Sequence, residues 1–172
     1  YEKIVVSRGL PHACIKELLE EFIYTDITGI TLFPGVLETL KKLKAQGYKL
    51  ILVTSGEKSM QNQKIQVLGL QYGYFDDIFI ADRVAGQLKN GYFKEIVQRY
   101  HLKPEEIICI GDKIEDELTA SRSLGMITVM LEQGRHYRAY LKERENHLKP
   151  DYSLKQIKDV FQIIHTDSLV MS

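Results

Sequence analysis

Three short segments of the sequence combine residue types that handle phosphate groups and hard cations. They are Thr54-Ser55-Gly56, the segment around Lys89, and the stretch from Gly111-Asp112 to Asp116 and Glu117. A hydroxyl and backbone N–H groups at a helix start can hold phosphate oxygens, a lysine can neutralise their charge, and carboxylates can bind Mg²⁺. Together these residues predict a site for phosphoryl transfer.

Each segment also has a purely structural explanation when it is taken alone. Asp112 suits a turn or a helix N-cap, and the acids after it would favour the positive end of the next helix. Thr54 would serve equally well as an ordinary N-cap, and Lys89 as a solvated surface lysine. The combination favours the site, because all three segments follow predicted strands.

The strands are predicted from short apolar runs that precede these segments. Residues 107–110 form an Ile-rich run that Gly111 ends, which is typical of a strand buried on both faces. Further strands are expected at residues 48–53, 78–80 and 127–131, and a short edge strand at 151–153. In an open α/β sheet the carboxyl ends of parallel strands share one edge, so the three segments should converge there.

Helices are predicted between these strands from apolar residues at helical spacing and from glycine stops. The expected helices are 11–24, 34–47 with Val36, Leu37, Leu40 and Leu43 facing inward, 57–68, one carrying Phe93 to Tyr100, one through Leu118 and Leu124, 135–149 and 154–164. The alternation of strands and helices predicts an α/β fold with three layers. Its sheet should be doubly wound, mostly parallel and Rossmann-like.

The composition indicates one compact domain that binds small molecules. The 172 residues are 44% hydrophobic, and 23 basic and 23 acidic residues leave no net charge, which argues against a nucleic-acid or membrane-surface partner. No apolar run approaches the roughly 20 residues of a membrane helix. Cys14 and Cys109 are far apart in sequence and suggest buried, reduced thiols, as expected in a cytoplasmic protein.

Residues 32–164 resemble the haloacid dehalogenase superfamily, most closely its capped phosphatase branch. The matching segments are LFPGVLETLKKLKAQGYKLILVTSG from Leu32, KNGYF from Lys89 and IICIGDKIEDELTASRSLGM from Ile107. They correspond to the second, third and fourth motifs of that family. The combination of these three motifs is specific to that family.

The resemblance implies a role for each motif residue. Thr54 would contact the transferring phosphoryl group, with Ser55 and Gly56 assisting, and Lys89 would neutralise its charge. Lys94 is the alternative to Lys89. Asp112, with Asp116 or Glu117, would bind Mg²⁺ directly or through water.

The family's first motif, Asp-x-Asp-x-Thr after an amino-terminal strand, is absent from this chain. Ser7 and Gly9 would replace both aspartates in a degenerate version at residues 4–9. The preferred interpretation is that residues 1–31 are the carboxyl-terminal part of a helical cap. Residues 32–172 would then be a core that lacks its first strand, and the chain a fragment of a longer protein.

The resemblance implies a Mg²⁺-dependent hydrolase of a small phosphorylated metabolite. An aspartate outside this chain would attack phosphorus, a second aspartate would protonate the leaving alkoxide, and water would hydrolyse the aspartyl-phosphate. The alternative is a non-catalytic regulatory or interaction module, because the nucleophile is missing. Carbon–halogen hydrolysis is disfavoured by Asp116 and Glu117, since in this family it uses neither Mg²⁺ nor an acid-rich fourth motif.

Overall fold

The computed structural model describes residues 27–146 and 149–167, together with the single residues 9, 11 and 15. Most of the predicted helix 11–24 lies outside the described residues, as do Ser7 and Cys14. The assignment of residues 1–31 to a cap therefore stays a prediction.

The described strands form two parallel ladders. They are β1 (Ile51–Gly56), β2 (Asp77–Asp82), β3 (Ile108–Gly111), β4 (Ile127–Leu131) and β5 (Tyr152–Leu154). β1 pairs with β2, and β4 lies between β3 and β5. Every pairing is parallel, as the alternation of elements predicts.

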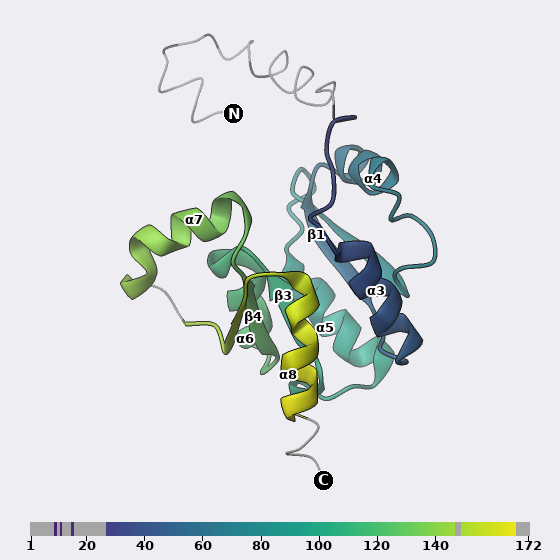
Figure 1. The fold of residues 1–172 in the computed structure, drawn as a ribbon. Coiled ribbons are helices and arrows are strands. Elements are labelled where there is room, and N and C mark those ends of the chain that lie inside the picture. The colour runs from purple at the N-terminus through teal and green to yellow at the C-terminus, as the bar shows by residue number, and fades with distance from the viewer. Residues whose placement is uncertain (1–8, 10, 12–14, 16–26, 147–148, 168–172) are drawn as a thin grey trace.

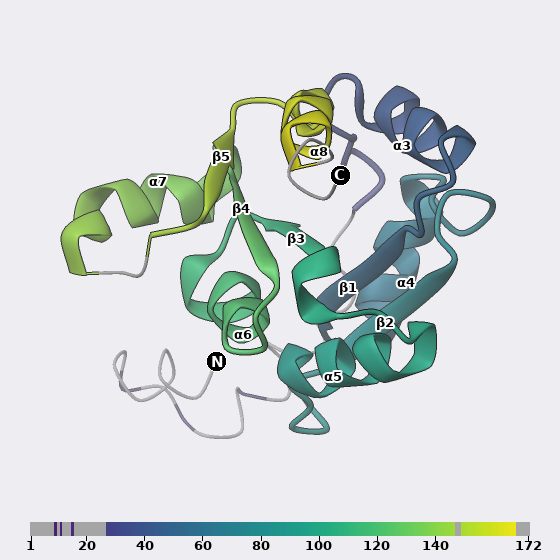
Figure 2. The same ribbon diagram turned by 90° about the horizontal axis from the view of Figure 1, so that it is seen from below.

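Helices cover both faces of these ladders (Figures 1 and 2). They are α3 (Val36–Ala45), α4 (Lys58–Val67), α5 (Lys89–Tyr100), α6 (Thr119–Arg122), α7 (Gly134–Glu143) and α8 (Val160–Asp167). Short 3-10 turns are η1 (Pro104–Glu106), η3 (Arg144–Asn146) and η4 (Ile157–Asp159), and η2 (Ile114–Leu118) is a π-helical turn. Figure 2 shows α3 and α8 on one side of the strands and α5 and α6 on the other.

Two apolar clusters confirm this three-layer arrangement. On the α3 and α8 side, Leu43 and Ile163 pack with Val129, and the partly buried Ile108 and Ile110 join them. On the other side the cluster is Phe79, Phe93, Ile96 and Met126, with Cys109 and other partly buried residues against it. Side chains of a strand alternate between its faces, so β3 contributes to both clusters.

The strand β1 begins and ends three residues later than predicted. The predicted strand covered residues 48–53, with Thr54-Ser55-Gly56 as a turn, whereas these three residues form the end of β1. They pair with Ile80, Ala81 and Asp82 of β2, so ladder hydrogen bonding extends the strand into a polar segment. The helix after it is as expected, because Glu57 accepts hydrogen bonds from the N–H groups of Ser59 and Met60.

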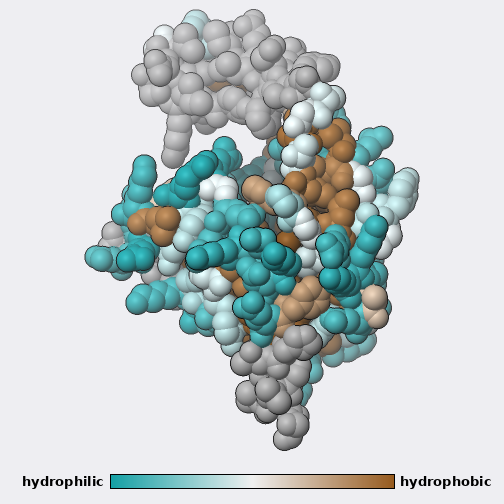
Figure 3. Space-filling view, in the orientation of Figure 1, coloured by the Kyte–Doolittle hydropathy of each residue, from teal (hydrophilic) through white to brown (hydrophobic). Residues whose placement is uncertain are grey.

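The buried face of α3 also differs from the prediction. Leu37 was expected to face inward but is 37% exposed, whereas Thr39 is buried. The Thr39 hydroxyl donates a 2.8 Å hydrogen bond to the Gly35 carbonyl, which satisfies it inside the layer. Figure 3 shows hydrophobic surface along the segment entering this helix, where Phe33 is also exposed.

A cavity of about 640 Å³ separates the two ladders. Its walls include Leu52 and Val53 of β1 and Ile108 and Ile110 of β3. Among the described residues no strand connects these two edges. Among the described strands, β3 therefore lies at the edge of its ladder.

No helix in the described part of the chain combines the length and apolar character needed to cross a membrane.

Candidate active site

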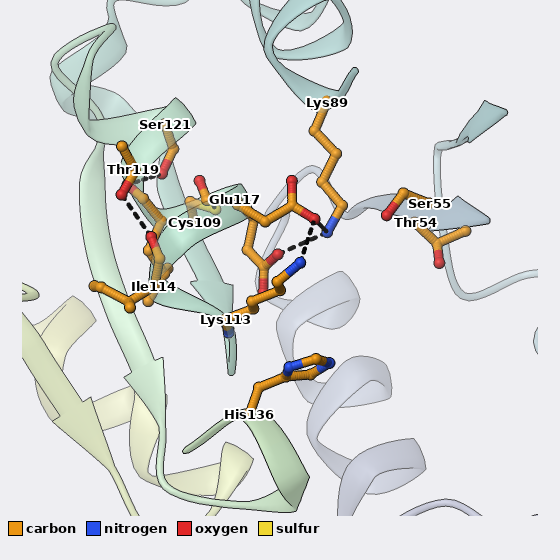
Figure 4. Close-up of polar contacts among 12 residues, drawn as sticks. Thr54, Ser55, Lys89, Cys109, Lys113, Ile114, Glu117, Thr119, Ser121 and His136 are labelled. Carbon is orange, nitrogen blue, oxygen red and sulfur yellow. Dashed lines mark hydrogen bonds and ion pairs between the residues drawn. The ribbon is translucent and has the colours of Figure 1, made fainter. Parts of the chain in front are cut away.

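The three predicted segments meet at the carboxyl ends of β1 and β3 (Figure 4). Lys89 enters from the first turn of α5, Glu117 and Lys113 come from the segment after β3, and Ser55 is the last residue but one of β1. The convergence predicted from parallel strand ends is therefore observed.

Lys89 lies at the centre of this group. Its side chain is 10% exposed, and its Nζ lies 2.6 Å from Glu117 Oε2 and 3.6 Å from Asp116 Oδ2. Lys94, one turn further along the same helix, is exposed to solvent. The structure thus brings Lys89 and not Lys94 to the acids after β3.

Glu117 is engaged at both carboxylate oxygens. Oε2 pairs with Lys89, and Oε1 accepts a 3.0 Å hydrogen bond from the Lys113 backbone N–H. The side chain lies so close to Gly111 that a Cβ there would come within 3.0 Å of three Glu117 atoms. Gly111 is required for this close approach, a role beyond ending the strand.

Asp116 is surrounded by cations. Its Oδ2 lies 3.0 Å from Arg83 Nη2, 3.6 Å from Lys89 Nζ and 3.8 Å from Lys113 Nζ. These three cations come from separate parts of the chain. A carboxylate in this position attracts all three cations to one point.

Arg83 and Lys113 are site residues that sequence reasoning missed. Arg83 follows β2, and its Nη2 also donates a 3.2 Å hydrogen bond to Ser55 Oγ. Lys113 directly follows Asp112, so its position was a usable signal. Arg83 lies in a loop without periodicity, and only the pairing of β2 with β1 carries it to the site.

Thr54 and Ser55 face opposite ways, because successive strand residues alternate. Thr54 Oγ1 donates to Gln61 Oε1 at 2.9 Å, whereas Ser55 Oγ points toward Lys89 in Figure 4. The Gly56 carbonyl accepts a 3.1 Å hydrogen bond from the Arg83 N–H. Thr54 was the predicted phosphoryl contact, but the geometry directs the Ser55 hydroxyl to the cations.

The Asp112 side chain, which follows β3, lies against the first residue of α7, Gly134. A Cβ at Gly134 would come within 2.8 Å of Asp112 Oδ2, so the helix begins against this carboxylate. Figure 4 also shows His136, from the first turn of α7, beside Lys113. No hydrogen bond or ion pair links the Asp112 carboxylate to another described residue.

The assignment of Mg²⁺ to Asp112 with Asp116 or Glu117 stays a prediction. The described residues contain no group of three or more His, Cys, Asp or Glu side chains positioned to hold a metal ion. Of the two alternatives for the second acid, Glu117 pairs with Lys89 and the Lys113 N–H, which favours Asp116 beside Asp112. Asp112 and Asp116 remain as a pair of oxygen donors.

Cys109 is not a nucleophile at neutral pH. Burial, the largest cause, and the nearby Glu117 carboxylate raise the pKa of its thiol to about 11. The thiol therefore stays protonated and donates weakly to the Glu117 carbonyl at 3.8 Å. It forms no disulfide.

The chain matches a known family over most of its length. The family described as haloacid dehalogenase-like hydrolase matches residues 3–131. Glyceraldehyde 3-phosphate phosphatase of Methanocaldococcus jannaschii is 30% identical over 133 residues, which cover 77% of this chain and 56% of that protein. Pyrophosphatase PpaX of Bacillus mycoides is 27% identical over 164 residues, covering 95% and 68%.

Solved structures show the same relationship. The HAD phosphatase from Thermococcus onnurineus has a TM-score of 0.61 and 26% identity, covering 95% of this chain and 70% of that one. The chain spans about half the length of the first curated relatives, 56% of each of two. The predicted α/β fold class is confirmed, and the chain belongs to the haloacid dehalogenase-like hydrolase family.

Proposed function

We propose that the protein containing this chain is a Mg²⁺-dependent hydrolase of small phosphomonoesters. The observation that carries the proposal is the buried Lys89, fixed by Glu117 beside Asp116 at the carboxyl ends of β1 and β3. A buried ammonium held in place costs little reorganisation when a phosphate approaches. Relatives named as phosphatases of glyceraldehyde 3-phosphate and phosphoserine support the same reaction class.

Asp112 and Asp116 would hold the metal ion. Mg²⁺ is usually bound through one or two carboxylates, keeping several waters and substrate oxygens as further ligands, which suits this pair. When bound, Mg²⁺ would polarise the phosphoryl oxygens and neutralise charge that develops on them. Glu117 would act as a positioning residue, because it holds Lys89 and has no free oxygen.

Lys89 and the β1 hydroxyls would bind the phosphoryl group. Ser55 Oγ points toward Lys89 Nζ, so the two can donate to the same phosphate. Thr54 would have to rotate away from Gln61 to take part. The Lys89 charge would stabilise the transition state more than the ground state as negative charge grows on the transferring oxygens.

The nucleophile would be an aspartate outside this chain. The cavity between β1 and β3 supports this proposal, because both its walls are unpaired strand edges among the described residues. Lys89, Asp112 and Glu117 line its polar end. An apolar strand parallel to β1 and β3 would satisfy both edges and deliver the residue after it to Lys89.

The reaction would then proceed in two steps. The aspartate carboxylate would attack phosphorus while the ester oxygen leaves and takes a proton from a second aspartate. Water would cleave the resulting aspartyl-phosphate and release inorganic phosphate. We place this enzyme in the cytoplasm, where the Cys109 thiol would remain reduced.

A non-catalytic module remains the second candidate, motivated by the missing first motif. The cation group around Asp116 would bind phosphate equally well in such a protein.

One experiment separates the two functions. The complete reading frame that contains this chain is sequenced, and its product is assayed with p-nitrophenyl phosphate and Mg²⁺. We expect an upstream apolar strand followed by Asp-x-Asp, turnover that a chelator abolishes, and loss of most turnover in Asp112→Asn. Full activity in excess chelator would refute the metal assignment, and an intact protein without turnover would favour the binding module.

A further inference from the structure

We propose that Arg83 binds a second anionic group of the substrate, so that the preferred substrates carry a carboxylate or another phosphate beside the phosphomonoester. The inference rests on the proposed function. It follows from the position, charge and anchoring of one side chain that no family motif in this sequence includes.

Arg83 spans the polar end of the crevice. Its Nη2 lies 3.2 Å from Ser55 Oγ on the β1 side and 3.0 Å from Asp116 Oδ2 on the η2 side. These are the residues proposed above for the phosphate and the metal ion. A group held by the Arg83 guanidinium therefore lies next to a phosphate held by Ser55 and Lys89.

The Arg83 side chain also faces solvent. It is 56% exposed, whereas that of Lys89 is 10% exposed. A guanidinium has five N–H donors, and Nη2 is the only one of its nitrogens that bonds to a described side chain. The remaining donors present the fork geometry that matches a carboxylate or phosphate.

Among the described residues, Asp116 is the one carboxylate that pairs with Arg83. Lys89 and Lys113 share the same carboxylate oxygen. If Asp116 were to bind a metal ion, the Arg83 guanidinium would lose its paired carboxylate, whereas Lys89 would keep Glu117. An anionic group on the substrate would then pair with Arg83.

The backbone that carries Arg83 is well anchored. The Arg83 N–H donates to the Gly56 carbonyl at 3.1 Å. Asp82 Oδ1 accepts from the Val84 N–H at 2.9 Å, and the Asp82 N–H donates to Gln87 Oε1 at 3.0 Å. A preorganised support of this kind reduces the entropy lost on binding, as expected of a recognition residue.

The test compares two substrates that differ by one group. Ethyl phosphate carries a methyl group where 2-phosphoglycolate carries a carboxylate. The intact protein is assayed with each at saturating Mg²⁺, and kcat/KM for 2-phosphoglycolate is divided by kcat/KM for ethyl phosphate. We expect a ratio of about ten or more for the unmodified protein and a ratio near one for Arg83→Gln, because a charge-assisted hydrogen bond is lost.

Two further variants sharpen the result. Arg83→Lys should recover part of the preference, since it keeps the charge without the planar fork. Arg138→Gln removes the same charge from an exposed position on α7 and should leave the ratio unchanged. The preference should appear mainly in KM.

Failure of this inference is distinguishable from failure of the proposed function. An equal fall in kcat/KM for both substrates in Arg83→Gln would mean that Arg83 only orients Asp116, and would overturn the second-anion site. A ratio near one in the unmodified protein would overturn it as well. If neither substrate is hydrolysed, the proposed function fails and the inference falls with it.

Discussion

At the scale of single residues, the site depends on one buried ion pair. Lys89 and Glu117 have side chains that are 10% and 11% exposed, so neither charge is well hydrated. Removing one partner of such a pair leaves the other charge buried without compensation. Breaking this pair should therefore cost more stability than breaking one of the exposed ion pairs of this protein.

We expect Glu117→Gln to lower the free energy of unfolding by about 3 kcal/mol, because it removes the closer partner of the Lys89 charge and leaves only Asp116, 3.6 Å away. Urea unfolding of the chain measures this change. The double variant Lys89→Met with Glu117→Gln should be less destabilised than the sum of the single changes. Glu105→Gln, at an exposed position, is the matched control, and an equally large effect there would contradict the prediction.

Gly111→Ala should disturb the same pair without changing any charge. The new Cβ would meet Glu117 closer than 3.0 Å, so the carboxylate must move away from Lys89. We expect a loss of stability of about 1–3 kcal/mol from overpacking, and a reduced kcat in the intact enzyme. Gly91→Ala on α5 is the control, since nothing lies within 4 Å of its Cβ position, and it should be neutral or slightly stabilising.

At the scale of elements, Asp76 ties α3, β1 and β2 together. Its Oδ2 accepts a 2.8 Å hydrogen bond from the Leu50 N–H, and its Oδ1 lies 2.9 Å from Lys44 Nζ. Burial opposes ionisation, but the Leu50 and Lys44 hydrogen bonds outweigh it and lower the pKa of Asp76 below its ordinary 3.8. The charged form is therefore favoured by folding.

Asp76→Asn should destabilise the protein by about 1–3 kcal/mol at neutral pH, because it removes hydrogen bonds to a charged group. Because the pKa of Asp76 is lower in the folded protein than in the unfolded chain, its ionisation stabilises the folded protein at pH values above the ordinary pKa of about 4. This contribution to the free energy of unfolding is lost as the pH falls from about 4 through the lowered pKa. Urea midpoints of both proteins should thus converge in that acidic range. Glu38→Gln, in an exposed pair with Lys42, should change little. If the difference in urea midpoint between the unmodified protein and Asp76→Asn stayed constant at acidic pH, Asp76 would be excluded as the titrating group.

At the scale of the whole molecule, helices hold the two ladders together, since no strand of the described residues is shared between them. The cluster containing Leu43, Val129 and Ile163 joins α3, β4 and α8 across the cavity. The apolar edges of β1 and β3 remain open to it. Such edges are templates for pairing with another segment.

We expect the chain Tyr1–Ser172 to hydrolyse no phosphomonoester by itself, even with Mg²⁺. Thr54 Oγ1 is hydrogen-bonded to Gln61, and the Cys109 thiol stays protonated, so neither is an activated nucleophile. An assay of the purified chain with p-nitrophenyl phosphate, beside the intact protein, tests this. Metal-dependent turnover that Asp112→Asn abolishes would reveal a nucleophile within the chain.

The sequence alone determined the order of elements and the residues at strand ends. The apolar run before Gly111 and the segment 127–131 correspond to β3 and β4, because periodicity and glycine stops are local signals. Lys89 and Asp116 were likewise found from their positions after strands. The family's motifs supplied their expected roles.

Only the tertiary structure decided which of these groups meet. Glu117 pairs with Lys89, because the absence of a side chain at Gly111 lets it fold back. Arg83 reaches Asp116 because the pairing of β1 with β2 sets its position. Both contacts join residues 28 or more positions apart in sequence. Local sequence patterns do not show which residues so far apart in sequence will be in contact, because these contacts depend on how the strands and helices pack.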